Sequence, residues 1–121
     1  MHTGWAFADT WLLAAIGVYQ RPCTLVEVIG AADWINHAVL LEDEVESALG
    51  KLTGAGLVRI YEGWTFELTD EGASLWSEGV RDLQGQLELI EAQLSAFEPG
   101  TRPVKLPRGV MAQALEDYRT T

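Results

Sequence analysis

Apolar side chains recur at helical spacing in the first part of the chain. The first such stretch predicts a helix that is capped by Asp9 or Thr10 and runs to about Gln20. Its apolar face consists of Leu12, Leu13, Ile16 and Tyr19. The pair Arg21-Pro22 ends the helix, because the residue before a proline is disfavoured in helical conformation.

A capping box at Thr24-Leu-Val-Glu27 marks the start of a second helix, which we expect to run to about Ala32. Asp33 is expected to cap a separate short turn over residues 34–38. The connection to the next helix would then be long, covering about residues 33–41. A helix-turn-helix normally uses three or four residues at this point.

A third helix is predicted from Glu42 to just before Gly56. Its inward apolar stripe consists of Val45, Ala48, Leu49 and Leu52. Residues 57–61 and 64–68 are rich in β-forming side chains and flank Glu62-Gly63. This pattern predicts a β-hairpin with a very short turn.

A long helix is predicted over residues 70–98, continuous with the preceding domain. Its apolar positions follow alternating steps of four and three, which is a heptad pattern. The seam residues are Trp76, Val80, Leu83, Leu87, Ile90, Leu94 and Phe97. We expect this seam to pack between two subunits as a dimer interface; packing against the first helix of the same chain is the alternative.

The two ends of the chain differ from its middle. Residues 1–8 form an N-terminal arm that bears Trp5 and Phe7. Residues 99–109 hold three of the four prolines and predict an extended linker. Residues 110–121 predict a short C-terminal helix, with Val110 to Arg119 as its helical part. The arm and the C-terminal helix are further candidates for exchange between subunits.

The order of these elements resembles that of winged helix-turn-helix proteins, in particular MarR- and PadR-type bacterial regulators. The residues that carry the resemblance are 45–58, Val-Glu-Ser-Ala-Leu-Gly-Lys-Leu-Thr-Gly-Ala-Gly-Leu-Val, and 66–72, Phe-Glu-Leu-Thr-Asp-Glu-Gly. The resemblance covers about residues 9–75 and implies a mainly α fold with a small β-hairpin. It also implies a homodimer whose third helix enters the major groove of DNA while the hairpin flanks it as a wing.

Charge argues against that use of the third helix. The net charge of the chain is −10, and residues 1–98 hold 16 acidic and four basic side chains. The predicted exposed face of the third helix consists of Glu42, Asp43, Glu46, Ser47, Gly50 and Lys51. The predicted wing consists of Arg59, Tyr61, Glu62, Gly63 and Trp64. Carboxylates at these positions repel phosphates and favour a basic protein partner.

The linker carries the main group of basic residues. Arg102, Lys105 and Arg108 are spaced by prolines and have no acidic residue among them. They can act as a weak, salt-dependent tether for phosphates, as solvated spacers, or as groups that pack along the acidic body of the chain itself.

Few residues suggest chemistry. Asp33 and His37 lie at i and i+4, but a metal site needs at least three protein ligands as a rule. Cys23 is the only cysteine and precedes a helix, where a lowered pKa would allow redox sensing. We identify no catalytic set and predict no cofactor and no metal site.

These observations predict a dimeric protein-interaction or adaptor module that does not read DNA itself. The alternative is a MarR/PadR-like DNA-binding transcription regulator, and a second alternative is a ligand- or redox-sensing domain. The apolar run 11–19 is too short to span a bilayer and has no basic leader, so we expect a cytoplasmic protein that is not a membrane protein.

Overall fold

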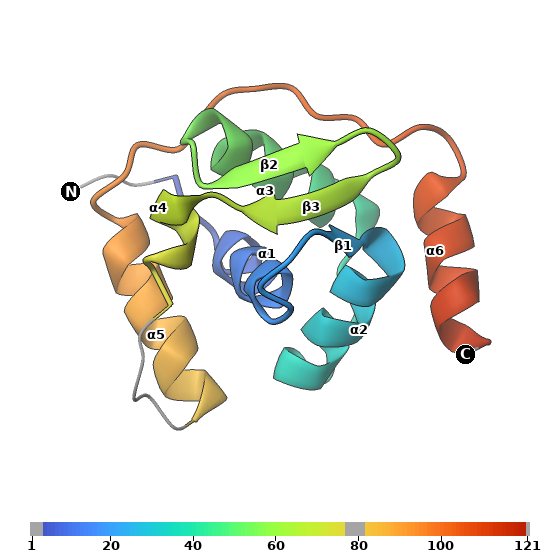
Figure 1. Ribbon diagram of the computed structural model, residues 1–121, viewed down its shortest axis with the longest axis horizontal. Helices are drawn as coiled ribbons and strands as arrows, with labels where there is room; N and C mark the ends of the chain where they lie inside the picture. The colour runs from blue at the N-terminus through green and yellow to red at the C-terminus, as the bar shows by residue number, and fades with distance from the viewer. Residues whose placement is uncertain (1–3, 77–81, 121) are drawn as a thin grey trace.

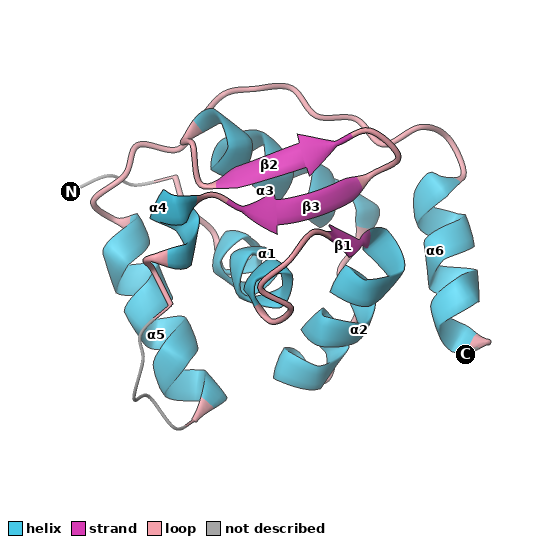
Figure 2. Cartoon of the chain, viewed as in Figure 1, coloured by secondary structure: helices cyan, strands magenta, loops and turns pink. Residues whose placement is uncertain are grey.

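The computed structural model describes residues 4–76 and 82–120, which form a mainly helical fold with a small three-stranded antiparallel sheet (Figures 1 and 2). The elements, in chain order, are α1 (Phe7–Gly17), β1 (Cys23–Thr24), α2 (Leu25–Asn36), α3 (Glu42–Gly54), β2 (Val58–Tyr61), β3 (Thr65–Leu68), α4 (Asp70–Ala73), α5 (Leu83–Leu94) and α6 (Val110–Arg119). Among these described helices, none is long and apolar enough to cross a membrane.

Helix α1 lies at the centre of the fold and is buried from Asp9 to Gly17. It begins earlier than predicted. Its N-cap is Ala6, and Asp9 lies within the first turn, where its carboxylate accepts a hydrogen bond from the Ala6 N–H at 2.7 Å. Neither Asp9 nor Thr10 is therefore the cap. A helix that is apolar nearly all round, as this one is, belongs in the core.

Helix α2 begins with the predicted capping box. Thr24 accepts from the Glu27 N–H at 3.2 Å, and the Glu27 carboxylate accepts from the Thr24 N–H at 2.9 Å. The helix continues past Ala32 to Asn36, so the separate turn capped by Asp33 is wrong. His37 ends the helix in the left-handed conformation, with its N–H bonded to the Asp33 carbonyl. The connection to α3 is thus only residues 37–41.

The predicted hairpin is confirmed, with Val58 opposite Leu68 and Tyr61 opposite Thr65. Strand β3 begins one residue later than predicted, because Gly63 and Trp64 take left-handed conformations in the turn. A third strand, β1, was not predicted. It pairs with β3 and gives the order β1-β3-β2. Two residues are too few to produce a strand periodicity in the sequence.

The single long helix predicted over residues 70–98 is wrong. Helix α4 ends at Ala73, residues 74–76 form turns, and α5 starts afresh after Asp82. Asp82 has extended backbone and caps α5 through a 2.6 Å hydrogen bond from the Gly85 N–H to its carboxylate. A good N-cap favours a new start over continuation of a helix.

The central seam residues pack inside the chain. Leu87, Ile90 and Leu94 are no more than 5% exposed, and α5 packs against α1. Leu83, Trp76 and Phe97 are partly buried against the same core. Val80 lies outside the described residues. The seam therefore covers the first helix of its own chain, because α1 needs an apolar partner on this side.

Both ends of the chain are fastened to the body. The Trp5 indole N–H donates to the Phe97 carbonyl at 2.9 Å. Helix α6 has the bounds that the sequence predicts and packs on α2 through buried Met111 and Ala114. The Tyr118 hydroxyl donates to the Asp33 carboxylate at 2.6 Å. Between α5 and α6, the extended linker runs past α3 and the hairpin (Figure 1).

Candidate functional site

Helix α3 separates its apolar and acidic residues as the sequence predicts. Its inward residues are fully buried: Val45, Ala48, Leu49 and Leu52. On the outer face Glu42, Asp43 and Ser47 are exposed, whereas Glu46 is half-buried. Glu44 accepts a hydrogen bond from the Leu41 N–H at 2.8 Å and so caps the helix. The first turn of α3 thus presents Glu42 and Asp43 to solvent.

The middle of that outer face is covered by the linker. Residues 100–106, which we call the cover, lie across α3 in extended conformation. A Cβ on Gly50 would overlap the carbonyl oxygen of Arg102, and a Cβ on Gly54 would come within 2.6 Å of the Gly100 Cα. Gly50 was predicted to be exposed and is instead buried. Glycine at these two positions lets a peptide backbone approach the helix closely.

Polar contacts hold the cover in place. The Gly100 N–H donates to the Lys51 carbonyl at 3.0 Å. The Leu106 N–H donates to Glu46 Oε2 at 2.7 Å, and Lys105 Nζ lies 3.7 Å from Glu46 Oε1. Glu46 thus binds the cover through both of its oxygens. Leu106 is buried, which adds an apolar anchor at this end of the cover.

Lys51, the only cation on the predicted exposed face, points toward α1. Its Nζ lies 3.0 Å from Asp9 Oδ2, and the Asp9 side chain is only 2% exposed. Asp9 needs this partner, because an unpaired buried carboxylate is costly. Lys51 is therefore paired with a buried residue of α1 and does not neutralise Glu42 or Asp43 on the outer face of α3.

The wing is a small, partly aromatic hairpin tip. The Tyr61 hydroxyl donates to Glu67 Oε1 at 2.6 Å, so these side chains associate across the two strands. Trp64 is half-buried, with its ring 6.4 Å from that of Phe66. Glu62 and Gly63 are exposed at the tip, and Arg59 is exposed on β2. A shallow groove separates this tip from Arg102–Lys105 of the cover.

The three basic linker residues have separate positions. Lys105 faces Glu46, and Arg102 contacts α3 through its backbone carbonyl. Arg108 lies beyond the cover in an exposed turn before α6. Of the alternatives that the sequence leaves open, packing along the acidic body applies to the segment that contains Arg102 and Lys105.

Cys23 is fully buried in β1. Its thiol donates to the Phe66 carbonyl at 3.4 Å. Burial is the main cause that raises its pKa to about 11. A thiol with a raised pKa forms little of the reactive thiolate at neutral pH, so Cys23 does not suit redox sensing.

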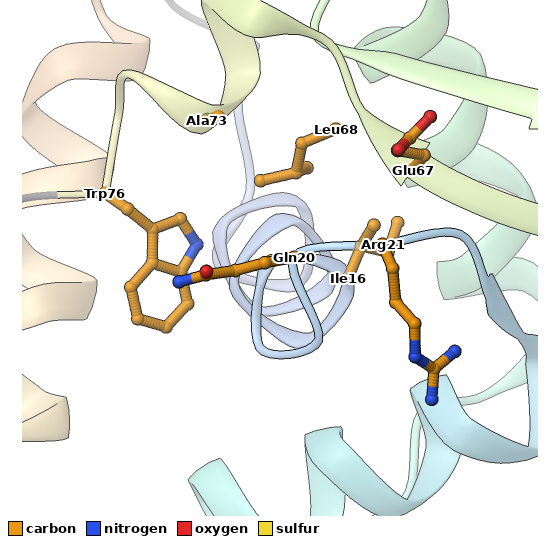
Figure 3. A pocket seen from close by; sticks show the side chains of 8 residues that line it. Ile16, Gln20, Arg21, Glu67, Leu68, Ala73 and Trp76 are labelled. Carbon is orange, nitrogen blue, oxygen red and sulfur yellow. The ribbon is translucent and has the colours of Figure 1, made fainter.

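A small pocket of about 270 Å³ lies between the end of α1, β3 and the turn after α4 (Figure 3). Gln20 extends toward the indole of Trp76, whereas Arg21 points away toward α2. Arg21 is engaged there by a 2.6 Å ion pair with Glu27. The Trp76 indole nitrogen is buried against Gly17, and no group in residues 4–76 or 82–120 forms a hydrogen bond with it. The other charged lining residue, Glu67, accepts the hydrogen bond from Tyr61, so both charged residues of the lining are engaged by neighbouring side chains.

The sequence does not reveal Asp9 and Leu106 as parts of this surface. Asp9 reads as a helix cap, and Leu106 reads as a linker residue. The available signal is the pair Gly50 and Gly54, since two glycines four residues apart on one helix face indicate a close backbone contact. That signal does not say which segment makes the contact.

Comparison with known proteins yields no relative: no family model, no curated protein and no solved structure matches the chain. We therefore base the proposed function on the contacts and charges of α3, the cover and the wing.

Proposed function

We propose that this protein is a cytoplasmic winged-helix domain that acts as a dimeric protein-interaction module and does not read DNA directly. Its docking surface is the outer face of α3, and its partner is a basic protein. The order α1-β1-α2-α3-β2-β3 with strand order β1-β3-β2 supports the winged-helix part of the proposal. The short connection 37–41 between α2 and α3 also supports it.

The exposure and pairing of the charged side chains on α3 favour a protein partner over DNA. Glu42 and Asp43 are exposed, and within the described ranges 4–76 and 82–120 neither has an ion-pair partner. Lys51, the one cation in the sequence of α3, is held by buried Asp9. Since affinity for DNA comes largely from cations that neutralise phosphates, a helix with this face repels the duplex.

The dimer needs another interface than the predicted one. Leu87, Ile90 and Leu94 are buried in the core of their own chain and cannot also line a subunit contact. Trp34 and Leu41 are large apolar residues that are 59% and 61% exposed. We assign the dimer contact to the end of α2 and its connection to α3, where these residues lie, because large exposed apolar side chains favour association.

A MarR/PadR-like regulator is the alternative. For α3 to enter a major groove, the cover would first have to leave Gly50 and Gly54, and the carboxylates would still face the phosphates. A ligand sensor would have to use the pocket beside Trp76, whose two charged lining residues, Arg21 and Glu67, are already engaged by Glu27 and Tyr61. We propose no enzymatic role.

The test compares two probes on the full chain by fluorescence anisotropy. One is a lysine-rich peptide, and the other is duplex DNA, both random and from upstream of the gene. We expect the peptide to bind at low salt and the DNA not to bind. DNA binding that survives physiological salt and prefers one sequence would contradict the proposal.

A matched pair of variants locates the peptide site. Glu42→Gln with Asp43→Gln should weaken peptide binding at least about fivefold, since each removed charge lowers the attraction. Glu88→Gln with Glu91→Gln makes the same change in net charge on the exposed side of α5. Equal loss in both pairs would show that the peptide binds the net charge of the protein and not α3.

A further inference from the structure

We infer that the cover, residues 100–106, is an intramolecular occupant of the α3 face, and that the partner which displaces it is an extended basic segment of another protein. This inference rests on the proposed function. It adds what shape the partner has and how its access to α3 is regulated.

The contacts of the cover show what the α3 face accepts. Most of them come from the peptide backbone: the Arg102 carbonyl lies on Gly50, Gly100 lies on Gly54, and the N–H groups of Gly100 and Leu106 donate to α3. Any extended peptide has such N–H and carbonyl groups, and a glycine is required only at the position that lies on Gly54. The face therefore suits an extended main chain, and its specificity must come from a few side chains.

Charge selects among extended segments. Glu46 is the only carboxylate of α3 that the cover engages, through Lys105 and the Leu106 N–H. Glu42 and Asp43 lie one turn away on the same side of the helix and are exposed. A segment with more cations than the cover, placed along the same line, would also reach these two. The chain's own cover is thus an incomplete match for the surface.

The contacts between the cover and α3 are weak enough for the cover to be released. Lys105 is 90% exposed, and an ion pair this exposed contributes little. The stronger bond is the short one from the Leu106 N–H to the Glu46 carboxylate, which is a charge-assisted hydrogen bond. The cover stays tethered by α5 and α6, so its effective concentration at α3 is high. A partner must displace the cover in order to bind, and this competition regulates access to the α3 face.

Gly100→Ala should open the cover without changing a side chain of α3. A Cβ at residue 100 would overlap the backbone of Gly54, and backbone cannot move aside cheaply. Thr101→Ala is the matched control, because Thr101 is exposed and is the next residue of the cover. Lys105→Glu opens the cover by repulsion from Glu46, and its exposed position is safe for folding. Its control is Arg108→Glu, with the same charge change outside the cover.

Two readouts are taken on the full-length variants. The first is hydrogen exchange at the Leu106 amide, which reports opening of the cover. The second is the anisotropy of a labelled peptide with the sequence of residues 99–109. We expect Gly100→Ala to speed exchange at least about tenfold and to bind the peptide at least about tenfold more tightly than the wild-type chain. Lys105→Glu should shift both readouts the same way by less, and the two controls should shift neither.

The outcomes separate the two proposals. If hydrogen exchange at the Leu106 amide is unchanged in both Gly100→Ala and Lys105→Glu, the inference that the cover can be displaced from α3 is wrong. The proposed function would be unaffected. If exchange is faster but the peptide does not bind, the inference of a basic partner is wrong, and so is the proposed docking role of α3. A mass of Gly100→Ala in light scattering that is twice the mass of the wild-type assembly would identify a second copy as the occupant and would show that the partner is not another protein.

Discussion

Helices α5 and α3 were both expected to present a face to a partner, and the chain itself covers both faces in different ways. The face of α5 is apolar, and Leu87, Ile90 and Leu94 are buried against the central helix α1. The face of α3 is polar, and a peptide backbone lies over it through two N–H bonds and one exposed ion pair. Burial of apolar side chains is a main source of folding stability, whereas polar contacts at a surface contribute much less.

The difference shows how to separate a core contact from a regulated one. A heptad pattern indicates an apolar face but does not say which helix covers it. An acidic helix face that contains glycines indicates that a peptide backbone, and not a set of apolar side chains, packs against it. In this protein the first face is buried in the core, and the second is the one from which we propose that the cover can be displaced.

The largest expected effect comes from the α5 side. Ile90→Ala should lower the free energy of unfolding by about 2–5 kcal/mol, because it leaves a cavity where Ile90 is fully buried. Leu89→Ala, on the exposed side of α5, should change it by no more than about 0.5 kcal/mol. Urea denaturation measures both. A loss of dimer mass without loss of stability in Ile90→Ala would place this residue between subunits instead.

The next effect concerns the ion pair that joins α3 to α1. Asp9→Asn should cost about 1–3 kcal/mol, because it leaves the Lys51 ammonium without its partner. Lys51→Met should cost at least as much, since Asp9 is then buried and unpaired. The double variant should recover part of the loss. Additive losses in the denaturation midpoints would mean that the two side chains do not interact.

A smaller effect is expected under the cover. Gly50→Ala gains about 1 kcal/mol of helix propensity but forces overlap with the Arg102 carbonyl, an overpacking cost of about 1–3 kcal/mol. The net result should be a modest loss of stability with faster exchange at the Leu106 amide. Ser47→Ala, on the exposed part of α3, has no such cost. If Gly50→Ala is more stable than the wild-type chain and exchange at the Leu106 amide is unchanged, the cover does not lie on α3.

The smallest effect belongs to an exposed pair outside both regions. Hydrogen bonds from Arg21, and then from the Thr24 backbone, lower the pKa of Glu27 to about 2. A carboxyl with a lowered pKa contributes stability above its unfolded pKa of about 4.3, and this contribution is lost as the pH falls toward 2. The contribution is small because the pair is exposed. Titration by NMR should show the pKa of Glu27 rise in Arg21→Gln; an unchanged pKa would contradict the pairing.

Local signals predicted much of the fold. The capping box at Thr24 and Glu27, the inward stripe of α3, the hairpin and the bounds of α6 all follow from short-range patterns, and the structure confirms them. What failed has two causes. The break before α5 rests on a local cap, the bond from the Gly85 N–H to Asp82, which the continuous heptad pattern outweighed in the prediction. The two-residue strand β1 depends on a long-range contact, because it exists only beside β3.

The candidate site was predicted in part for the same reason. The acidic residues of α3 could be assigned to its outer face from helical spacing. The commitment of Lys51 to Asp9 joins residues 42 positions apart, and the bond from Leu106 to Glu46 joins residues 60 apart. No periodicity carries such pairings, because they depend on how α1, α3 and the linker come together in space.

The most direct test of this account is native-state hydrogen exchange on the unmodified chain, with the Leu106 amide compared with amides in the middle of α5 as denaturant is added. We predict that the Leu106 amide exchanges through a local opening whose free energy lies well below that of global unfolding, whereas the α5 amides exchange only when the whole chain unfolds. Exchange of both through the same global unfolding would mean that the cover is as permanent as the core, and that the face of α3 is never vacated.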